Sequence, residues 1–361
     1  MKRFLLPLLL PTAVLTAAAA NSAVQEFREL PAHDCVAAPA VPAQAVPRNI
    51  ILMIGDGMGA EQMSVGWLAN RGRLNLEQAA YTGLSRTTSA SHTVTDSAAG
   101  GTALACGRKT INGHVGQDAE GNRLVSLLRE AEFLGKSTGL VVTKDITDAT
   151  PAAFYAHTDD RRKAAEIATY LTICGAEFVR GGGSRNFTEK ELQRMREDGT
   201  DIQLTAEKHL PPASERGDVL VQDTREALAA LADNEKGFFL MVEGSQIDVA
   251  CHNNDLREAA CEMLDFDMAV GAVLEWMRSH PDTLLVVTAD HQTGGLNILD
   301  GSKQDGYVKG TFATPSHNGI YVPIYAHGPG AEAFTGIMEN TKVFELLHAA
   351  MNRGMQPANA N

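Results

Sequence analysis

The chain has 361 residues, of which 44% are apolar, 21% are charged and 6% are aromatic, a composition that supports a large buried core. It excludes collagen, coiled-coil and wholly disordered chains. The 44 acidic side chains outnumber the 31 basic ones and give a formal charge of −13, which argues against a nucleic-acid partner or an anionic membrane surface. Such a protein binds an anionic substrate only where something else supplies positive charge locally.

The N-terminus has the layout of a cleavable secretory signal. Two basic residues precede an apolar run from Phe4 to Leu15, and an Ala-rich stretch follows. We therefore predict a signal peptide over residues 1–20 and a periplasmic or secreted protein with no membrane attachment after cleavage. Removing its two basic side chains takes the net charge from −13 to −15. Residues 21–48 are predicted to form an extended leader, and residues 49–361 a single domain.

The cysteines give little guidance about the fold. They are odd in number, so at most two disulfides can form, and their pairing stays open. No CxxC spacing occurs, which disfavours a thiolate metal site. The five positions are Cys35, Cys106, Cys174, Cys251 and Cys261.

Short apolar runs alternate with longer amphipathic ones along the rest of the chain. The short runs are rich in Val, Ile, Leu and Phe and predict buried strands over 49–54, 138–142, 237–242, 283–288 and 320–326. Helical spacing predicts helices over 121–135, 160–173, 223–232, 256–277 and 341–351. This alternation predicts an α/β fold, a three-layer sandwich with a mostly parallel central sheet.

Acidic side chains follow four of the predicted strands. A single Asp after a strand is usually an ordinary helix cap, but four acid-bearing strand ends indicate a site. In an open α/β sheet, ligands bind at this carboxyl edge. In chain order the strands lead to Asp56, to Asp145 and Asp148, to Glu243, and to Asp290 with His291.

A second pattern adds imidazoles to these carboxylates. Asp248 and His252 are four residues apart and share one face if the segment is helical. Such a pair alone is usually a solvated ion pair, but His291 and His317 strengthen the case for metal. Mixed Asp, His and Glu ligands suit two zinc ions, and the remaining oxygen donors, Asp56, Thr150 and Glu243, suit magnesium.

A polar turn then opens into a helix of very small residues over 97–103. Ser97 is predicted at the helix N-terminus, where exposed backbone N–H groups and the helix dipole favour an anion. A serine in that place is usually only a cap. No GxSxG motif occurs, so the natural functional interpretation is a metal-bound serine alkoxide and not a Ser-His-Asp hydrolase.

Seven stretches of the chain resemble the alkaline phosphatase family. They occur in the family's order and extend from residue 49 to about residue 330. The resemblance implies the alkaline-phosphatase α/β sandwich, hydrolysis of small phosphate monoesters, two Zn²⁺ and one Mg²⁺ per chain, and usually a homodimer. The stretches are 49–59, 95–101, GRKTING at 107–113, DATPAAFYAH at 148–157, MVEGSQIDVACH at 241–252, TADHQTGG at 288–295 and 316–319.

The resemblance also implies a role for each site residue. Ser97 is the nucleophile and forms a phosphoserine intermediate, and Arg161 clamps two phosphate oxygens with its planar fork. One zinc falls to Asp248, His252 and His317. The other falls to Asp56, Asp290, His291 and Ser97. Magnesium falls to Asp56, Thr150 and Glu243, with Asp148 adjacent to these ligands.

The sequence differs from the family pattern in two places, and each difference leads to an expectation about phosphate binding or about the dimer. Val249 stands where the best-known bacterial members have a lysine that pairs with the counterpart of Asp148. Asp148 then lacks that partner, and phosphate is expected to be held less tightly. Only about two dozen residues separate His291 from His317, so the crown insertion of many members is expected to be absent, and both a homodimer and a monomer stay open.

Two other functions stay open. A phosphodiesterase of the same superfamily would share the zinc ligands, but it should lack a magnesium ligand at Glu243 and the phosphate arginine at Arg161. A secreted zinc- or phosphate-binding protein without turnover would need no nucleophile at Ser97. The sequence therefore favours hydrolysis of monoesters over both alternatives.

Overall fold

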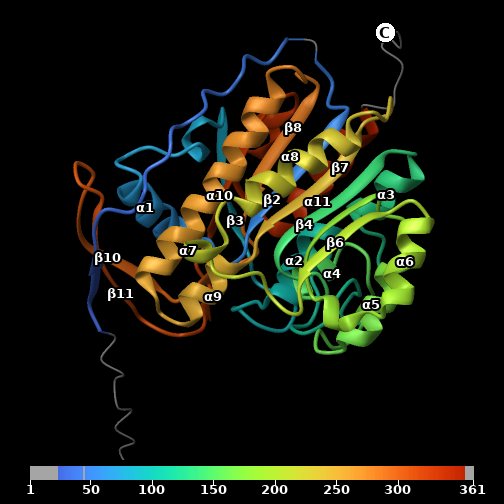
Figure 1. The fold of residues 1–361 in the computed structure, drawn as a ribbon, viewed down its shortest axis with the longest axis horizontal. Coiled ribbons are helices and arrows are strands. Elements are labelled where there is room, and N and C mark those ends of the chain that lie inside the picture. Colours follow the sequence, from blue (N-terminus) through green and yellow to red (C-terminus); the bar gives the residue numbers. More distant parts are fainter. Residues whose placement is uncertain (1–22, 44, 354–361) are drawn as a thin grey trace, which may run out of the picture.

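The computed structural model describes residues 23–43 and 45–353, and its centre is a nine-stranded sheet (Figure 1). Among these strands β13 alone runs antiparallel to its neighbours, so the predicted mostly parallel α/β sheet is confirmed. The predicted signal peptide lies outside the described residues. In spatial order the strands are β14 (Gly336–Glu339), β3 (Tyr81–Arg86), β13 (Val322–His327), β8 (Thr283–Thr288), β2 (Asn49–Gly55), β7 (Phe238–Gly244), β4 (Ser137–Asp145), β5 (Phe178–Gly182) and β6 (Asp201–Ala206).

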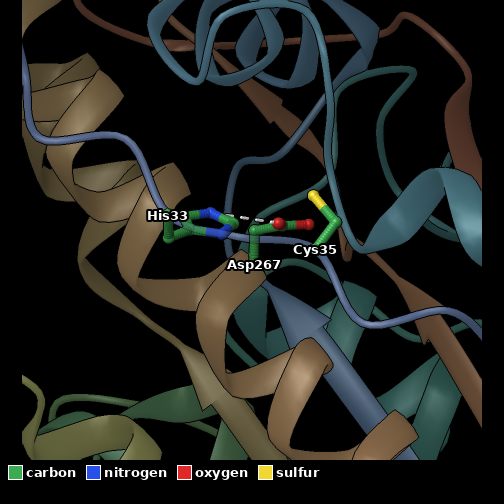
Figure 2. Close-up of side chains that lie close together, drawn as sticks. All are labelled: His33, Cys35 and Asp267. Carbon is green, nitrogen blue, oxygen red and sulfur yellow. Dashed lines mark ion pairs between the residues drawn. The ribbon is translucent and has the colours of Figure 1, made fainter.

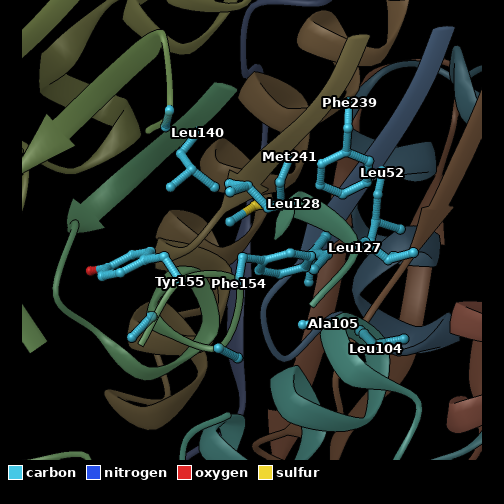
Figure 3. Close-up of a cluster of buried hydrophobic side chains, with 14 of the residues drawn as sticks. Leu52, Leu104, Ala105, Leu127, Leu128, Leu140, Phe154, Tyr155, Phe239 and Met241 are labelled. Atoms are coloured by element: carbon cyan, nitrogen blue, oxygen red, sulfur yellow. The ribbon is translucent and has the colours of Figure 1, made fainter. Parts of the chain in front are cut away.

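The middle strands β2, β7 and β8 are buried at every position and mostly apolar, because helices cover both faces of the sheet. Every residue of β2 is buried. Successive side chains of a strand point to opposite faces, so Ile50 and Leu52 pack into one core and Ile51 and Met53 into the other. Figure 3 shows the first core, in which Leu52 lies among side chains of α2, α3, β4 and β7.

The helices form the two outer layers (Figure 1). Residues of α1, α8, α9 and α10 contribute to one core, and residues of α2 to α6 and α11 contribute to the other. The longest helix, α10, begins and ends where its periodicity predicts. The helices are α1 (Ala60–Ala69), α2 (Ser97–Cys106), α3 (Leu127–Phe133), α4 (Ala149–Ala152), α5 (Ala164–Leu171), α6 (Glu189–Glu197), α7 (Ala213–Arg216), α8 (Val219–Leu231), α9 (Gln246–His252), α10 (Leu256–Met277) and α11 (Asn340–Arg353).

Two predicted helices are shorter than expected. The helix predicted over 121–135 is confined to α3, because Gly121 has a φ of +85° and Ser126 accepts a hydrogen bond from the Arg129 N–H as the helix cap. The helix predicted over 160–173 is confined to α5. Strands β3, β5, β6 and β14 were not predicted, since they are short and lack a continuous apolar run.

Two small sheets lie outside the central one. The predicted extended leader contains a strand, β1 (Gln25–Phe27), which pairs with β11 (Tyr307–Phe312), and β11 in turn pairs with β10 (Leu296–Ser302). Strand β12 (His317–Asn318) pairs with β9 (Gln292–Thr293). The segment between His291 and His317 is therefore a short excursion that returns to the same place in the fold.

Candidate metal centre

Four neighbouring strands of the central sheet end at one edge, and predicted metal ligands lie at the ends of three of them. Strands β8, β2, β7 and β4 are adjacent and parallel, so their carboxyl ends meet in space. Asp56 follows β2, Glu243 lies near the end of β7, and Asp290 follows β8. The pairing of Ile54 with Glu243 sets the ends of β2 and β7 side by side.

Asp56, Asp290 and His291 form an inner cluster. One ligand atom of each lies within 4.8 Å of the other two, and all three side chains are buried. The Nε2 atom of His291 is 3.5 Å from Oδ1 of Asp56 and 3.3 Å from Oδ2 of Asp290. Those two carboxylate oxygens have no hydrogen-bond partner among the described residues. Buried carboxylate oxygens without donors are the ligands that a cation requires.

The electrostatics of the inner cluster agree with this interpretation. Burial, together with the charges of Asp290 and Asp248, raises the pKa of Asp56 well above its usual range. Burial and the charge of Asp248 raise the pKa of Asp290 to about 6. Burial lowers the pKa of His291 well below its usual value, so its imidazole is neutral and able to ligate a metal.

Asp248, His252 and His317 form an outer cluster with the same tight spacing. Nε2 of His252 and Nε2 of His317 lie 3.2 Å and 3.5 Å from Oδ1 of Asp248, and 3.1 Å from each other. Each Nδ1 faces a backbone carbonyl, that of Pro315 at 2.6 Å and that of Thr95 at 2.9 Å. Nδ1 must therefore donate, so when each ring is neutral its unprotonated nitrogen is Nε2, which faces the shared carboxylate as in zinc sites. Without a metal, the hydrogen bond to Asp248 raises the pKa of His252 and, against the effect of burial, that of His317.

The third predicted set, Asp56, Thr150 and Glu243, consists of oxygen donors. All three residues are buried, and Glu243 Oε2 has no hydrogen-bond partner among the described residues. Burial raises the pKa of Glu243 to about 8, although the charge of Lys144 opposes the shift. Uncompensated oxygens of this kind fit a hard cation such as Mg²⁺.

Ser97 is the first residue of α2, as predicted. Its Oγ lies 3.2 Å from Nε2 of His291, so it faces the inner cluster. All ten residues of α2 are buried, and its small side chains let the helix approach the metal ligands closely. A Cβ atom added at Gly100 would lie 3.0 Å from the backbone oxygen of Asp290, and one at Gly101 would lie 3.2 Å from Cα of Thr150.

Arg161 faces the same edge of the sheet. Its Nη2 lies 2.9 Å from Oδ1 of Asp148, and its Nη1 lies 3.4 Å from Oδ2 of Asp96, the residue that caps α2. The neighbouring Arg162 pairs with Asp160 and is 86% exposed. Arg161, Asp148, Asp248 and His252 all line one pocket of about 490 Å³.

Lys144 is a site residue that the sequence analysis missed. It lies near the end of β4 with only 9% of its side chain exposed, and its Nζ is 2.6 Å from Oδ2 of Asp148 and 3.8 Å from Oδ2 of Asp56. Burial alone would raise the pKa of Asp148, but Lys144 and Arg161 hold it well below its usual range. Val249 therefore does not leave Asp148 without a lysine. The expectation of weaker phosphate binding loses its premise, because an ammonium group reaches this carboxylate from β4.

Asp145 is a strand-end acid with another role. Its Oδ1 accepts hydrogen bonds from the N–H and the hydroxyl of Thr147, and its carboxylate also accepts from the Asn186 amide. These contacts fix the turn between β4 and α4. Asp145 thus shapes the loop that carries Asp148, without joining either cluster.

Comparisons of the sequence and the fold with known proteins find alkaline phosphatases. A sequence profile described as "Alkaline phosphatase" matches residues 47–209 and 198–308. Alkaline phosphatase 4 of Bacillus subtilis is 31% identical over an alignment that covers 85% of this chain and 89% of that protein. The structure of alkaline phosphatase from the Antarctic bacterium TAB5 is similar, with a TM-score of 0.80, 33% identity, and coverage of 86% of this chain and 99% of that one. A variant of the TAB5 enzyme with magnesium bound is similar as well, at 32% identity, a TM-score of 0.80 and the same coverage of 86% and 99%.

Proposed function

The chain belongs to the alkaline phosphatase family and is a metal-dependent phosphomonoester hydrolase, and we propose that Ser97 is the nucleophile that its metal centre serves. One observation carries this proposal. The Ser97 hydroxyl lies at a helix N-terminus, 3.2 Å from Nε2 of His291 in the inner cluster. A hydroxyl is a weak nucleophile at its ordinary pKa, and adjacent cations are one of the ways in which enzymes activate it.

The residues fit three metal ions, two Zn²⁺ and one Mg²⁺. The inner and outer clusters supply imidazole and carboxylate, which suit zinc. Asp56, Thr150 and Glu243 supply oxygens only, which suit magnesium. One carboxylate oxygen each of Asp56, Asp290 and Glu243 has no hydrogen-bond partner within residues 23–43 and 45–353, which supports this assignment. When bound, the ions supply the positive charge that favours ionised Ser97 and stabilises a departing oxygen.

The chain's own residues carry two successive displacements. Oγ of Ser97 attacks phosphorus in line, the bond to the alcohol oxygen breaks, and the phosphoryl group becomes attached to Ser97. Water then displaces Ser97 and releases inorganic phosphate. Arg161 faces this position, and its guanidinium fork matches two phosphate oxygens. Asp148, which contacts Arg161 at 2.9 Å, holds the fork in place.

Lys144 supplies a further fixed positive charge to this pocket. Its ammonium and the Arg161 guanidinium contact opposite oxygens of Asp148, so the carboxylate is shared between two cations. Without Lys144, Asp148 would have Arg161 as its remaining cationic partner and would attract the guanidinium more strongly. The pocket would also have one positive charge fewer. We assign Lys144 as a positioning residue for phosphate.

Lys144→Ala should weaken the binding of inorganic phosphate by about tenfold or more, which is about 1.4 kcal/mol, because the pocket loses a positive charge and Asp148 then competes more strongly with phosphate for the Arg161 guanidinium. Calorimetric titration of the metal-loaded protein with phosphate measures this change. Lys163→Ala is the matched control, because Lys163 is an exposed lysine of the same region that pairs with Asp159. Unchanged phosphate affinity in Lys144→Ala would refute the assignment.

A second substitution separates charge from simple structural loss. Val249 lines the same pocket as Lys144. Adding Val249→Lys to Lys144→Ala restores an ammonium group to the pocket, now carried by α9 and not by β4. Phosphate affinity should therefore recover in part. If the double variant binds phosphate no better than Lys144→Ala, the effect of Lys144 does not come from the charge that it brings to the pocket.

Monoester specificity is proposed over diester specificity because Arg161 and Glu243 are both present at the site. Purified protein should hydrolyse a chromogenic phosphate monoester much faster than the matching diester, and chelation should abolish both activities. Faster hydrolysis of the diester would favour a phosphodiesterase of the same superfamily. The pocket offers charged groups for phosphate, so the alcohol half of the substrate is selected weakly.

The protein is proposed to act in the periplasm or outside the cell, with residues 1–20 as a signal peptide and residues 49–361 as one catalytic domain. The supporting observation for export is the sequence of the N-terminus, which has a basic start, an apolar run and an Ala-rich exit. Over residues 23–43 and 45–353, none of the helices has the length and apolar character needed to cross a bilayer.

A further inference from the structure

The leader, residues 21–48, brings two potential metal ligands against α10. Figure 2 shows His33 and Cys35 on the leader beside Asp267 of α10. One ligand atom of each residue lies within 4.8 Å of the other two. None of the three belongs to the inner or outer cluster of the catalytic centre. They form a second, separate group of imidazole, thiol and carboxylate, which we call the leader cluster.

The carboxylate of Asp267 is buried and held in one orientation by hydrogen bonds. Its side chain is completely buried, and its carboxylate accepts hydrogen bonds from the backbone N–H groups of Asn75 at 2.8 Å and Leu76 at 2.9 Å. The Asn75 amide adds a third donor at 3.1 Å. Donors of this kind orient a carboxylate that binds metal. No lysine or arginine forms an ion pair with Asp267 among the described residues, so its charge faces His33 and Cys35.

The two leader residues present free ligand atoms to this carboxylate. Nδ1 of His33 lies 3.1 Å from the backbone oxygen of Asp34 and therefore donates, so Nε2 is the ring atom that faces Asp267 and that a metal would bind. Burial lowers the pKa of His33, but the hydrogen bond and charge of Asp267 outweigh it and raise the pKa, so zinc would have to displace a proton from Nε2 when the ring is protonated. Nε2 is buried and lies 3.2 Å from Oδ2 of Asp267, but it makes no hydrogen bond of adequate geometry among the described residues. Within the described part of the chain, the one hydrogen-bond contact of the Cys35 thiol is a long one, 3.9 Å, with the amide of Asn70.

The leader backbone is fixed around these side chains. The N–H of His33 donates to Oδ1 of Asn70, and the N–H of Val36 donates to Oδ1 of Asn75, both at 2.7 Å. The positions of His33 and Cys35 are thus set by the folded domain and do not depend on a bound ion. A preformed arrangement of this kind lowers the conformational cost of binding a metal.

We propose that His33, Cys35 and Asp267 bind a zinc ion outside the catalytic centre and that this ion fastens the leader to α10. One nitrogen, one sulfur and one oxygen ligand suit Zn²⁺, with water as the fourth ligand. As the zinc–sulfur bond forms, the Cys35 thiol releases its proton to solvent. Before zinc binds, burial and the charge of Asp267 raise the pKa of this thiol to about 11, so the thiol stays protonated.

Cobalt substitution tests the proposal without relying on catalysis. The ligands assigned to the catalytic centre are oxygen and nitrogen atoms only, so a sulfur-to-cobalt charge-transfer band in the near ultraviolet must come from a cysteine. The cobalt-loaded full-length protein should show this band, and Cys35→Ser should lose it. Cys261→Ser, which changes the other partly exposed cysteine, should keep the band.

Metal analysis of the zinc-loaded proteins gives the second readout. Cys35→Ser should contain one zinc ion per chain fewer than the parent, with monoesterase activity unchanged. Absence of the cobalt band from the parent, or an equal zinc content in Cys35→Ser and the parent, would overturn the proposal and leave a His33–Asp267 ion pair as the role of these residues. These readouts do not depend on Ser97, so they can fail while the catalytic assignment stands.

Discussion

Ser97→Ala should lower kcat by at least about 10⁴-fold, since removal of a nucleophile eliminates the covalent route and leaves only the residual effects of binding and electrostatics. Its zinc content should stay near normal, because Asp56, Asp290 and His291 hold the inner cluster without Ser97. Steady-state kinetics with a chromogenic monoester, together with metal analysis of the same preparation, measure both quantities.

The control for this substitution is Ser64→Ala. Ser64 is an exposed serine of α1 whose hydroxyl donates to the backbone oxygen of Ala60 at 2.8 Å, away from the metal clusters. Its replacement should leave kcat unchanged. If Ser97→Ala kept more than about a hundredth of the parent's activity, a residue other than Ser97 would have to take the phosphoryl group.

Removal of the metals should have the second large effect. Exhaustive chelation should reduce monoesterase activity by about 10²-fold or more, because the cations that favour ionised Ser97 and stabilise the departing oxygen are then absent. Each lost ion that was present at about a thousand times its Kd also removes about 4 kcal/mol from the free energy of unfolding. Zinc and magnesium added together should restore both quantities.

The loss of stability on chelation should depend on pH in a defined direction. In the metal-free protein, burial raises the pKa of Glu243 to about 8 and of Asp290 to about 6, and it raises the pKa of Asp56 as well. Carboxyl groups whose folded-state pKa exceeds the unfolded value of about 4 bind more protons in the folded state. Their contribution to the free energy of unfolding therefore falls as the pH rises from about 4 to 8.

Urea unfolding at about pH 5 and about pH 8, with and without metals, measures this dependence. The metal-free protein should be less stable at the higher pH, while the metal-loaded protein should not show this loss, because bound cations favour the ionised carboxylates. A metal-free protein that becomes more stable at the higher pH would show that these carboxylates are not protonated when the metals are absent.

Much of the fold and the set of candidate ligands could be predicted from the sequence. The buried strands β2, β7 and β8 are continuous apolar runs, and a parallel sheet brings their carboxyl ends to one edge regardless of the rest of the topology. The spacing of Asp248 and His252 predicted two members of the outer cluster, because both lie in α9 and residues four apart share one face of a helix. His317 joins them because the pairing of β12 with β9 returns it to the site.

The missed features depend on contacts that have no local pattern. Lys144 follows an apolar run in β4, and only the three-dimensional path of its side chain brings Nζ to Asp148. His33 and Cys35 are separated from Asp267 by roughly 230 residues, so nothing in the spacing indicates the leader cluster. The absence of CxxC spacing argued against a thiolate site, but that signal detects only sites whose ligands are close in sequence.

The central claim is that the phosphoryl group passes through Ser97, and the stereochemistry at phosphorus tests it most directly. A monoester made chiral at phosphorus with oxygen isotopes is the substrate, and an added alcohol is the acceptor. Each in-line displacement inverts the configuration, so transfer through a phosphoserine predicts overall retention after two displacements. Overall inversion would mean a single direct displacement and would contradict a covalent intermediate on Ser97.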